Sequence, residues 1–223
     1  MDGTLVETEQ YWGEALAALA HRLGGRLSPE ARQATVGTSM RRSMQVVDDD
    51  LGIRRSEAQW DADSRWVEDI TAGLMGEGIE WRPGAAALVS AVREAGLATA
   101  LVTTTPRRLA EIVLRSIRDD LGADPFHHTV CGDEVPARKP DPAPYRQAMA
   151  ALDVDAAACV VIEDSHAGVT AGLAAGAAVL GVSSLQPLPP APGLTLLDSL
   201  HGVGVPDLHD VLAARHGVDL AAC

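Results

Sequence analysis

The first third of the chain carries apolar residues at helical spacing. Stripes of such residues begin at Leu16, Met40 and Trp60. A further helix is expected after Ser28, because a proline and a glutamate follow this serine in the order typical of a helix start. The pattern predicts a small antiparallel bundle of helices over residues 9–79.

After residue 80 the pattern changes to helices that alternate with short apolar runs. The runs are rich in β-branched residues and predict strands over 97–102, 129–131, 159–162 and 178–182. Helices are predicted between them, over 109–117, 145–152 and 167–175. Strands separated by helices pair in parallel, so the predicted fold class is α/β with a doubly wound, Rossmann-like sheet. The expected domains are residues 1–8 with 80–223, and an inserted all-helical domain over 9–79.

The composition argues against several classes of partner. Hydrophobic residues make up 47% of the chain and charged residues 22%, which is typical of a globular protein. A formal net charge of -13 offers no basic field to nucleic acid or to an anionic membrane. The sequence has no apolar run of roughly 20 residues and no basic segment followed by an apolar one at its start. We therefore expect a cytoplasmic protein, with no nucleic acid or membrane as partner, and a monomer by default. Its cysteines are widely spaced, and reduced thiols are expected.

Polar residues follow the predicted strands. Thr103-Thr104-Thr105 come after the first strand, Asp133-Glu134 after the second and Glu163-Asp164 after the third. Lys139 lies just before a predicted helix, and the chain opens with an acidic turn that contains Asp2. In doubly wound sheets the active site lies at the carboxyl ends of the strands. These groups are therefore expected to lie close together.

This set of side chains suits a phosphate group and a hard cation. Magnesium prefers oxygen ligands, typically one or two carboxylates with phosphate and water, and Glu163 and Asp164 can supply them. The hydroxyl of Thr103 and the ammonium of Lys139 can hold phosphoryl oxygens while Asp2 moves a proton. By itself, Asp164 is more often a helix cap and Lys139 a solvated surface residue. Together they favour a phosphate and metal site.

Four motifs in order, with the helical segment between the first two, resemble the haloacid dehalogenase superfamily. They are Asp-Gly-Thr-Leu-Val from Asp2, Leu-Val-Thr-Thr-Thr up to Thr105, Lys-Pro-Asp-Pro from Lys139, and Val-Ile-Glu-Asp-Ser-His-Ala-Gly around Asp164. Each motif alone is weak, whereas all four in order are a specific signal. The resemblance covers essentially the whole chain. More narrowly, the chain is similar to the branch that contains β-phosphoglucomutase and phosphoglycolate phosphatases, whose helical cap is inserted after the first motif.

The resemblance implies a magnesium-dependent phosphatase that acts on a small phosphorylated metabolite, of the sugar phosphate or phosphoglycolate type. The reaction would pass through a phosphoaspartyl intermediate. Asp2 would be the general acid/base and would lend its carbonyl oxygen to Mg²⁺. Thr103 and Thr104 would bind the phosphoryl group, and Lys139 would stabilise it and orient the nucleophile.

The resemblance also implies metal ligands and a cap residue. Asp164 would bind Mg²⁺, with Glu163 as a further ligand close by. Arg41, in the cap, would either meet a second anionic group of the substrate or simply face water.

The chain departs from the family's first motif, in which a hydrophobic strand and a nucleophilic aspartate precede a second aspartate. Here Asp2 is the second aspartate and Met1 the residue between the two. The nucleophile would lie just before Met1, and the first central strand would also be missing. We expect that the start codon has been misassigned to Met1. A chain that truly begins there would be a non-catalytic pseudo-phosphatase.

A phosphosugar mutase similar to β-phosphoglucomutase is the alternative reaction. The mutases place a histidine in the first cap helix and an arginine after a Gly-x-Ser turn. This chain has Trp12 and Met40 at those positions. The sequence therefore favours the phosphatase.

Overall fold

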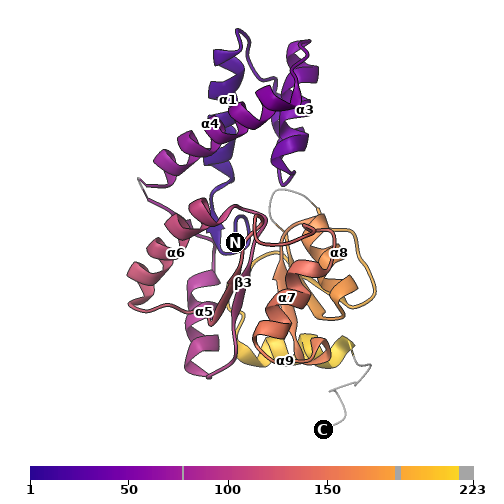
Figure 1. Cartoon of the computed structure of the whole chain (residues 1–223). Helices are drawn as coiled ribbons and strands as arrows, with labels where there is room; N and C mark the ends of the chain where they lie inside the picture. The colour runs from indigo at the N-terminus through magenta and orange to yellow at the C-terminus, as the bar shows by residue number, and fades with distance from the viewer. Residues whose placement is uncertain (77, 184–186, 216–223) are drawn as a thin grey trace. The chain divides into compact units, whose positions relative to one another are not determined.

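The computed structural model describes residues 1–76, 78–183 and 187–215. Within them the chain forms two compact units (Figure 1). The α/β unit comprises Met1–Val6 together with the chain from Glu80 onward, and the helical unit comprises Glu7–Ile79.

The helical unit contains, in its described residues, α1 Glu9–Arg22, α2 Pro29–Thr35, α3 Met40–Leu51 and α4 Glu57–Met75. Serine side chains set three of the starts, because Ser28, Ser39 and Ser56 each accept a hydrogen bond from a backbone N–H in the first turn. The start of α4 is a full capping box, in which the Gln59 side chain bonds back to the Ser56 N–H. The three helices expected from the apolar stripes and the one expected after Ser28 are all present.

These stripes meet in the core of the helical unit. Leu19, Met44, Val47 and Val67 have no exposed surface, and Trp12 packs against them while partly buried. Helix α1 packs against α4, and α3 contacts α2 and α4. The methionines and tryptophans of this region therefore serve mainly to pack the bundle.

A charged network is buried beside this core. Arg55 Nε donates to Asp48 Oδ1 at 2.5 Å, and Arg55 Nη1 donates to Asp63 Oδ2 at 2.7 Å. The three side chains are only 5%, 7% and 13% exposed. Trp60 Nε1 also donates to Asp48, and Arg22 pairs with Asp63 at 3.4 Å. Two arginines thus face two aspartates.

The strands of the α/β unit form three groups. In the first, β1 Val6–Glu7 pairs with β2 Glu80–Trp81. The second joins β3 Ala100–Val102 in parallel with β4 His128–Val130, and the third joins β5 Val160–Glu163, β6 Ala178–Val182 and β7 Leu194–Leu197, also in parallel. In the described residues β3–β4 and β5–β6–β7 are separate hydrogen-bonded sheets. The alternation of the sequence therefore predicted the parallel pairing correctly.

The first predicted strand starts later than expected. The apolar run from Leu97 predicted a strand over 97–102, but β3 begins at Ala100. Leu97 N donates instead to Val92 O, and Gly96 has a φ of 68°, which turns the chain at the end of the preceding helix. Leu97 is 36% exposed, so its apolar character reflects the helix end and not a buried strand.

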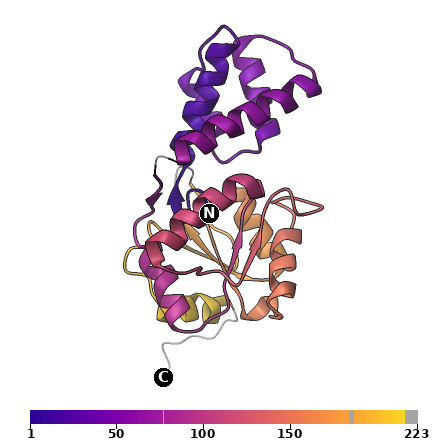
Figure 2. The ribbon, with the colours of Figure 1, turned by 60° about the vertical axis from the view of Figure 1, so that its left-hand side comes forward.

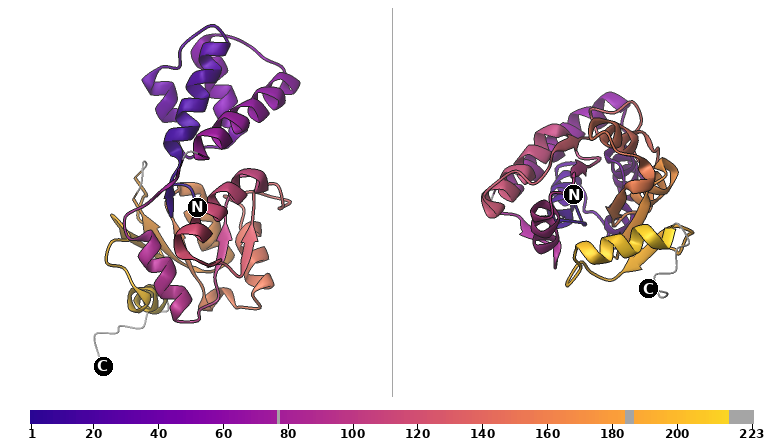
Figure 3. Two further views of the ribbon diagram at one scale, coloured as in Figure 1. Left: turned by 90° about the vertical axis from the view of Figure 1, so that its left-hand side faces the viewer. Right: turned by 90° about the horizontal axis from the view of Figure 1, so that it is seen from below.

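Helices cover the strands of the α/β unit on both sides (Figures 2 and 3). They are α5 Ala85–Glu94, α6 Arg107–Leu121, α7 Ala143–Ala151, α8 His166–Ala175 and α9 Val205–Arg215, with a 3₁₀ turn at Ala156–Ala158. Helix α7 packs on β3 and β4, α8 on β5 and β6, and α9 on β5 and β6 as well. The predicted α/β class is confirmed, and each of the strands β3 to β6 packs against at least one helix.

Two other expectations concern the chain as a whole. Among the described helices, none combines the length and the apolar character that a bilayer crossing requires. Cys131 and Cys159 are free thiols, and Cys223 lies outside the described residues.

Candidate functional site

The N-terminal turn is hydrogen bonded to the ends of two strands. Thr4 Oγ1 donates to Asp164 Oδ1 at 2.6 Å, directly after β5. Asp2 Oδ2 accepts from Thr105 Oγ1 at 2.8 Å and, more weakly, from Thr103 Oγ1 at 3.5 Å, directly after β3. Three of the four motifs, which are more than 50 residues apart in the sequence, therefore meet at the strand ends.

The fourth motif reaches the same place through its lysine. Lys139 Nζ donates to Glu163 Oε1 at 2.5 Å and to Val102 O at 2.9 Å. The Lys139 and Glu163 side chains are 6% and 7% exposed. Tyr145 places its ring under the ammonium, 4.7 Å from Nζ, and its hydroxyl donates to Glu163 Oε1 at 2.6 Å. The lysine is thus not a solvated surface residue but part of a buried ion pair.

Glu163 is held as a carboxylate by this environment. Burial by itself raises its pKa, but the charge of Lys139, the α-ammonium of Met1 and the hydrogen bonds from Lys139 and Tyr145 outweigh burial and lower the pKa to about 2. Its second oxygen accepts from the backbone N–H groups of Asp164 and Ser165 and from the Ser165 hydroxyl. Both carboxylate oxygens are therefore engaged by donors of the protein.

Ser165, and not Asp164, caps helix α8. Ser165 Oγ accepts from Gly168 N at 3.0 Å. Gly168 also leaves room for the Glu163 carboxylate, because a Cβ at this position would lie 1.9 Å from the Glu163 carboxyl carbon. The alternative interpretation of Asp164 as a helix cap is therefore wrong. Its carboxyl group accepts a hydrogen bond from Thr4 in the N-terminal turn instead.

Asp164 has the opposite pKa shift from its neighbour. Burial raises the pKa of Asp164 to about 6, and the negative charges of Glu163 and Asp2 add to this effect. The hydrogen bond from Thr4 and the Met1 α-ammonium act in the other direction. A cation beside Asp164 would favour its ionised form, because burial and the negative charges of Glu163 and Asp2 disfavour that form. This corner suits a divalent metal ion.

A metal ion would find few carboxylates here. In the described part of the chain, no group of three or more His, Cys, Asp or Glu side chains is arranged as a metal site. Magnesium does not require one, because it commonly takes one or two carboxylates and completes its shell with phosphate oxygens and water. The oxygen-rich surroundings of Asp164 fit that mode of binding and not an all-protein cage.

The three threonines after β3 have different environments. Thr103 and Thr105 are 6% and 7% exposed, and Thr103 Oγ1 also accepts from Thr105 N at 3.1 Å. Thr104 is exposed. Thr103 and Asp2 thus lie together, as the sequence predicts, and Thr104 stands next to them on the surface.

Comparison with known proteins supports the same grouping of motifs. A sequence profile for haloacid dehalogenase-like hydrolase matches residues 1–176. Protein CbbY of Rhodobacter capsulatus is 32% identical over 189 residues, with 81% of each chain covered. Hexitol phosphatase A of Escherichia coli is 33% identical over 189 residues, which covers 82% of this chain and 81% of that one. The crystal structure of CbbY from Rhodobacter sphaeroides in complex with phosphate is 28% identical, covers 94% of this chain and 96% of that one, and has a TM-score of 0.78.

The chain belongs to the haloacid dehalogenase-like hydrolases. This membership confirms the predicted superfamily and branch. It also confirms the predicted enzyme class, because the family is one of hydrolases and its curated relatives include phosphatases, which are phosphoric monoester hydrolases.

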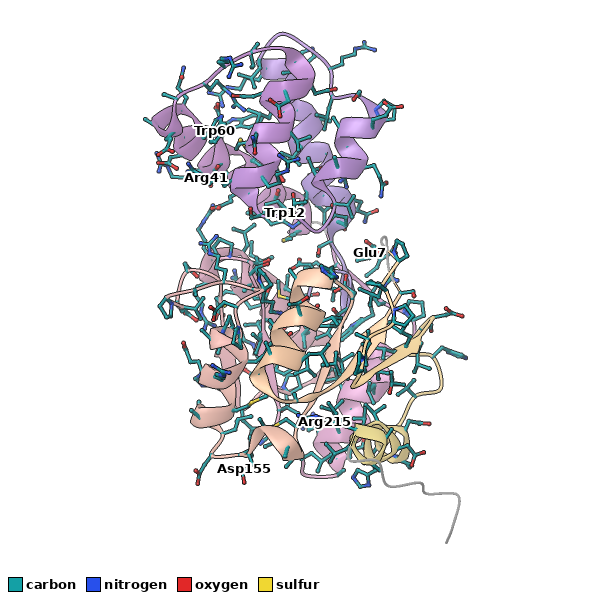
Figure 4. All side chains as sticks on the ribbon, turned by 90° about the vertical axis from the view of Figure 1, so that its right-hand side faces the viewer. Glu7, Trp12, Arg41, Trp60, Asp155 and Arg215 are labelled. Atoms are coloured by element: carbon teal, nitrogen blue, oxygen red, sulfur yellow. The ribbon has the colours of Figure 1, made fainter. Side chains whose placement is uncertain are left out.

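One predicted site residue of this haloacid dehalogenase-like hydrolase, Arg41, belongs to the helical unit. Its guanidinium forms an ion pair with Glu57 and lies over the Trp60 ring, 5.5 Å from the centroid (Figure 4). Arg41 and Trp60 line a pocket of about 370 Å³ together with Ser39, Arg42 and Gln45. The arginine is therefore partly neutralised, and its surroundings combine charge, amide and aromatic surface.

The sequence did not single out several residues that lie at these strand ends. Thr4 and Ser165 stand inside recognised motifs, but nothing in the sequence assigns them a partner. Thr105 was noted as part of a threonine run, whereas the structure makes it the stronger hydroxyl donor to Asp2. Tyr145 carried no signal, because a tyrosine on an amphipathic helix is ordinarily a core residue.

Proposed function

We propose that this hydrolase is a magnesium-dependent phosphatase for a small phosphorylated metabolite, of the sugar phosphate or phosphoglycolate type. The observation that carries the proposal is the position of Lys139. The chain has 18 lysines and arginines, and Lys139 is the single lysine among them. It lies buried against Glu163, beside the strand ends that carry Thr103 and Asp164. The one compact ammonium group of the chain thus lies where phosphoryl oxygens would bind, and all the other basic side chains among the lysines and arginines are guanidinium groups.

The proposed reaction has two steps. An aspartate immediately before Met1 attacks phosphorus, the ester bond breaks, and Asp2 gives its proton to the leaving oxygen. Asp2 then takes a proton from the water that attacks the phosphoaspartyl group, and phosphate is released. The hydrogen bonds from Thr103 and Thr105 hold the Asp2 carboxyl at the strand ends, which supports its role as the proton carrier.

The phosphoryl oxygens are proposed to meet three groups of this chain. The Thr103 hydroxyl and Thr104 would donate hydrogen bonds, and Lys139 would place its charge beside the oxygens that gain negative charge in the transition state. Lys139 is already fixed by Glu163 and the Val102 carbonyl, so little reorganisation is needed during the reaction.

Asp164 and the backbone carbonyl of Asp2 are the proposed magnesium ligands. The bound ion would neutralise charge on the phosphoryl group. Support comes from the raised pKa of Asp164, because a buried carboxyl beside two others is stabilised as an anion by a cation. Direct ligation by Glu163 stays a prediction, and it would require exchange of hydrogen bonds that now hold Lys139 and the start of α8.

The helical unit is proposed as the cap that recognises the rest of the substrate. Arg41 and the pocket that it lines supply groups suited to an anionic or hydroxylated ligand. The cytoplasmic location remains a prediction from the sequence, and the monomer remains the default expectation for a two-domain enzyme whose cap opens and closes.

The central experiment compares two chains. One begins at Met1, and the other, the Asp-extended chain, carries a short hydrophobic strand that ends in an aspartate directly before Met1, behind a new initiator. We expect the Asp-extended chain to release phosphate from p-nitrophenyl phosphate in a magnesium-dependent reaction. The chain that begins at Met1 should release it more slowly by several orders of magnitude. A panel of sugar phosphates and phosphoglycolate then identifies the substrate class. A folded Asp-extended chain that releases no phosphate from any of them would refute the proposal.

A phosphosugar mutase is the second candidate. The chain's similarity to the β-phosphoglucomutase branch favours it, whereas Trp12 and Met40 stand against it. Trp12 is partly buried against the bundle core and offers no proton-carrying group. Formation of glucose 6-phosphate from β-glucose 1-phosphate without free phosphate would reverse the order of the two candidates.

A further inference from the structure

Arg107, the first residue of α6, uses all of its guanidinium donors. Its Nε donates to Glu134 Oε1 and its Nη2 donates to Glu134 Oε2, both at 2.7 Å. Nη1 donates to Thr129 Oγ1 at 2.6 Å and to Glu111 Oε1 at 3.2 Å, and Nη2 also donates to Thr129 O at 3.1 Å. A guanidinium has five N–H donors, so each of them has an acceptor. Such complete use is notable for a side chain that is 31% exposed.

The location of this arginine is unfavourable without a partner. Helix N-termini carry partial positive charge, which disfavours a basic side chain in the first turn. The first turn of α6 has no acidic residue, and Pro106 at its N-cap position provides no side-chain cap. Asp133, from the segment after β4, supplies the cap, because its Oδ1 accepts from Arg107 N at 2.8 Å. Asp133 and Glu134 thus bring two carboxylates to the start of α6.

The same segment packs closely on the threonine turn. Gly132 N donates to Thr105 O at 3.1 Å. A Cβ at position 132 would lie 2.0 Å from Thr104 O, so a side chain there would push the two segments apart. Arg138 Nε donates to Gly132 O at 2.7 Å and folds the segment back on itself. Lys139 is the next residue.

We propose that Arg107 and Glu134 form a positioning clasp, which fixes the loop that carries Lys139 against the turn that carries Thr103. The inference rests on the proposed function, because it concerns two groups assigned to the phosphoryl site. Arg107 and Glu134 are positioning residues that act through Lys139 and Thr103. The clasp also explains Asp133-Glu134, which the sequence placed with the acids of the site and which the structure bonds to Arg107.

The test exploits the single lysine of the chain. An amine-specific acetylating reagent modifies Lys139 and the N-terminal amine alone, and peptide mass spectrometry reads the two separately. Arg107→Met in the Asp-extended chain is expected to speed acetylation of Lys139 by about tenfold, because local opening exposes the buried ammonium. It is also expected to lower kcat for p-nitrophenyl phosphate by about ten- to a hundredfold, with a smaller change in KM, because the reacting groups lose their alignment.

Arg118→Met is the matched control. Arg118 lies on the same helix, is 36% exposed, and pairs with Glu111 and Asp124. Its replacement is expected to leave kcat and the acetylation rate unchanged. Arg107→Lys keeps the charge but cannot form the paired bonds to Glu134, so partial recovery of kcat is expected.

Glu134→Gln tests the clasp from the other side and serves if Arg107→Met does not fold. It keeps the shape of the side chain and removes the charge, and it should change both readouts in the same direction. The proposal is overturned if the clasp variants lower the Tm while their kcat and Lys139 acetylation match those of Arg118→Met. If the unsubstituted Asp-extended chain releases no phosphate, the proposed function fails, and the acetylation rates still decide whether the clasp fixes Lys139.

Discussion

Both units bury a cationic side chain against carboxylates, but the two clusters differ in their charge balance. In the helical unit, Arg55 bonds to Asp48 and to Asp63, and Arg22 also pairs with Asp63. In the α/β unit, Lys139 bonds to Glu163, and Asp164 adds a further carboxyl whose contact is the neutral Thr4 hydroxyl. In the first cluster the two arginines and the two aspartates form ion pairs with one another. The second cluster contains Asp164, whose ionised form is disfavoured by burial and by neighbouring carboxylates.

The difference separates a structural ion pair from a binding site. Buried charges that stabilise a fold are matched by partners, because an unpaired buried charge is strongly destabilising. Groups with perturbed pKa values concentrate instead where a ligand is bound or a proton is moved. The raised pKa of Asp164 beside the lowered pKa of Glu163 supports our proposal that the α/β cluster is the functional one.

The largest expected effect is from Lys139→Met in the Asp-extended chain. Loss of the ammonium should reduce kcat by about 10²- to 10³-fold, as for removal of one group that stabilises transition-state charge. It should also lower the free energy of unfolding by about 3–5 kcal/mol, because Glu163 loses the partner of a buried pair. Phosphate release and urea unfolding measure the two effects.

The double variant Lys139→Met/Glu163→Gln separates these effects. Removing the negative charge of Glu163, which has lost its partner, should recover most of the free energy of unfolding but none of the activity. Recovery of both would mean that Lys139 acts on stability alone, and the contrast between the two clusters would disappear.

Arg55→Met is the corresponding change in the helical unit. It leaves Asp48 and Asp63 without their shared partner and should cost about 3–5 kcal/mol of stability. The kcat of the protein that remains folded should not change, because the network supports the bundle and no reacting group. Urea unfolding and phosphate release are the measurements, with the exposed neighbour Arg54→Met as control. A cost no larger than that of Arg54→Met would contradict a structural role for the network.

Asp164→Asn should stabilise the metal-free protein at high pH. The folded pKa of about 6 lies above the ordinary value of 3.8. The stability that this group contributes is therefore fully present below pH 3.8 and is lost as the pH rises through about 6. Removing the charge should gain about 1–2 kcal/mol at pH 8 and nothing at pH 4, after allowance for partial exposure.

Thermal unfolding with and without Mg²⁺ measures this effect. Added Mg²⁺ should stabilise the unsubstituted protein more than the Asp164→Asn variant, because the ion loses a ligand. The exposed Asp119→Asn serves as control and should show neither the pH dependence nor the metal dependence. Equal responses of Asp164→Asn and Asp119→Asn would remove Asp164 from the metal site.

The smallest expected effect is a gain of stability in the helical unit. Thr71 is fully buried, and within the described residues its hydroxyl is the one buried side-chain polar atom that has no hydrogen-bond partner. Thr71→Val should raise the free energy of unfolding by about 1 kcal/mol, because a buried unpaired hydroxyl is removed. Thr35→Val is the matched control, since that buried hydroxyl donates to Arg32 O at 2.7 Å and its loss should destabilise. A destabilised Thr71→Val would show that its hydroxyl has a role.

Much of the site was predictable because the motifs follow strands. Parallel strands bring their carboxyl ends to one edge, so Thr103, Lys139 and Asp164 could be grouped without a structure. The same argument grouped Asp133-Glu134 with these residues, and the structure gives them a different partner. Both follow a strand, but their side chains bond to Arg107, and strand position does not specify side-chain direction.

The order of the elements, the parallel pairing and the family were predictable from the chain alone, because periodicity and motif order are local properties. Which side chains pair with one another depended on the folded structure. In the folded chain Lys139 and Tyr145 donate hydrogen bonds to Glu163, Thr4 donates to Asp164, and Arg107 donates to Glu134. These choices depend on distances between side chains that are far apart in sequence, and packing of the helices on the strands fixes such distances.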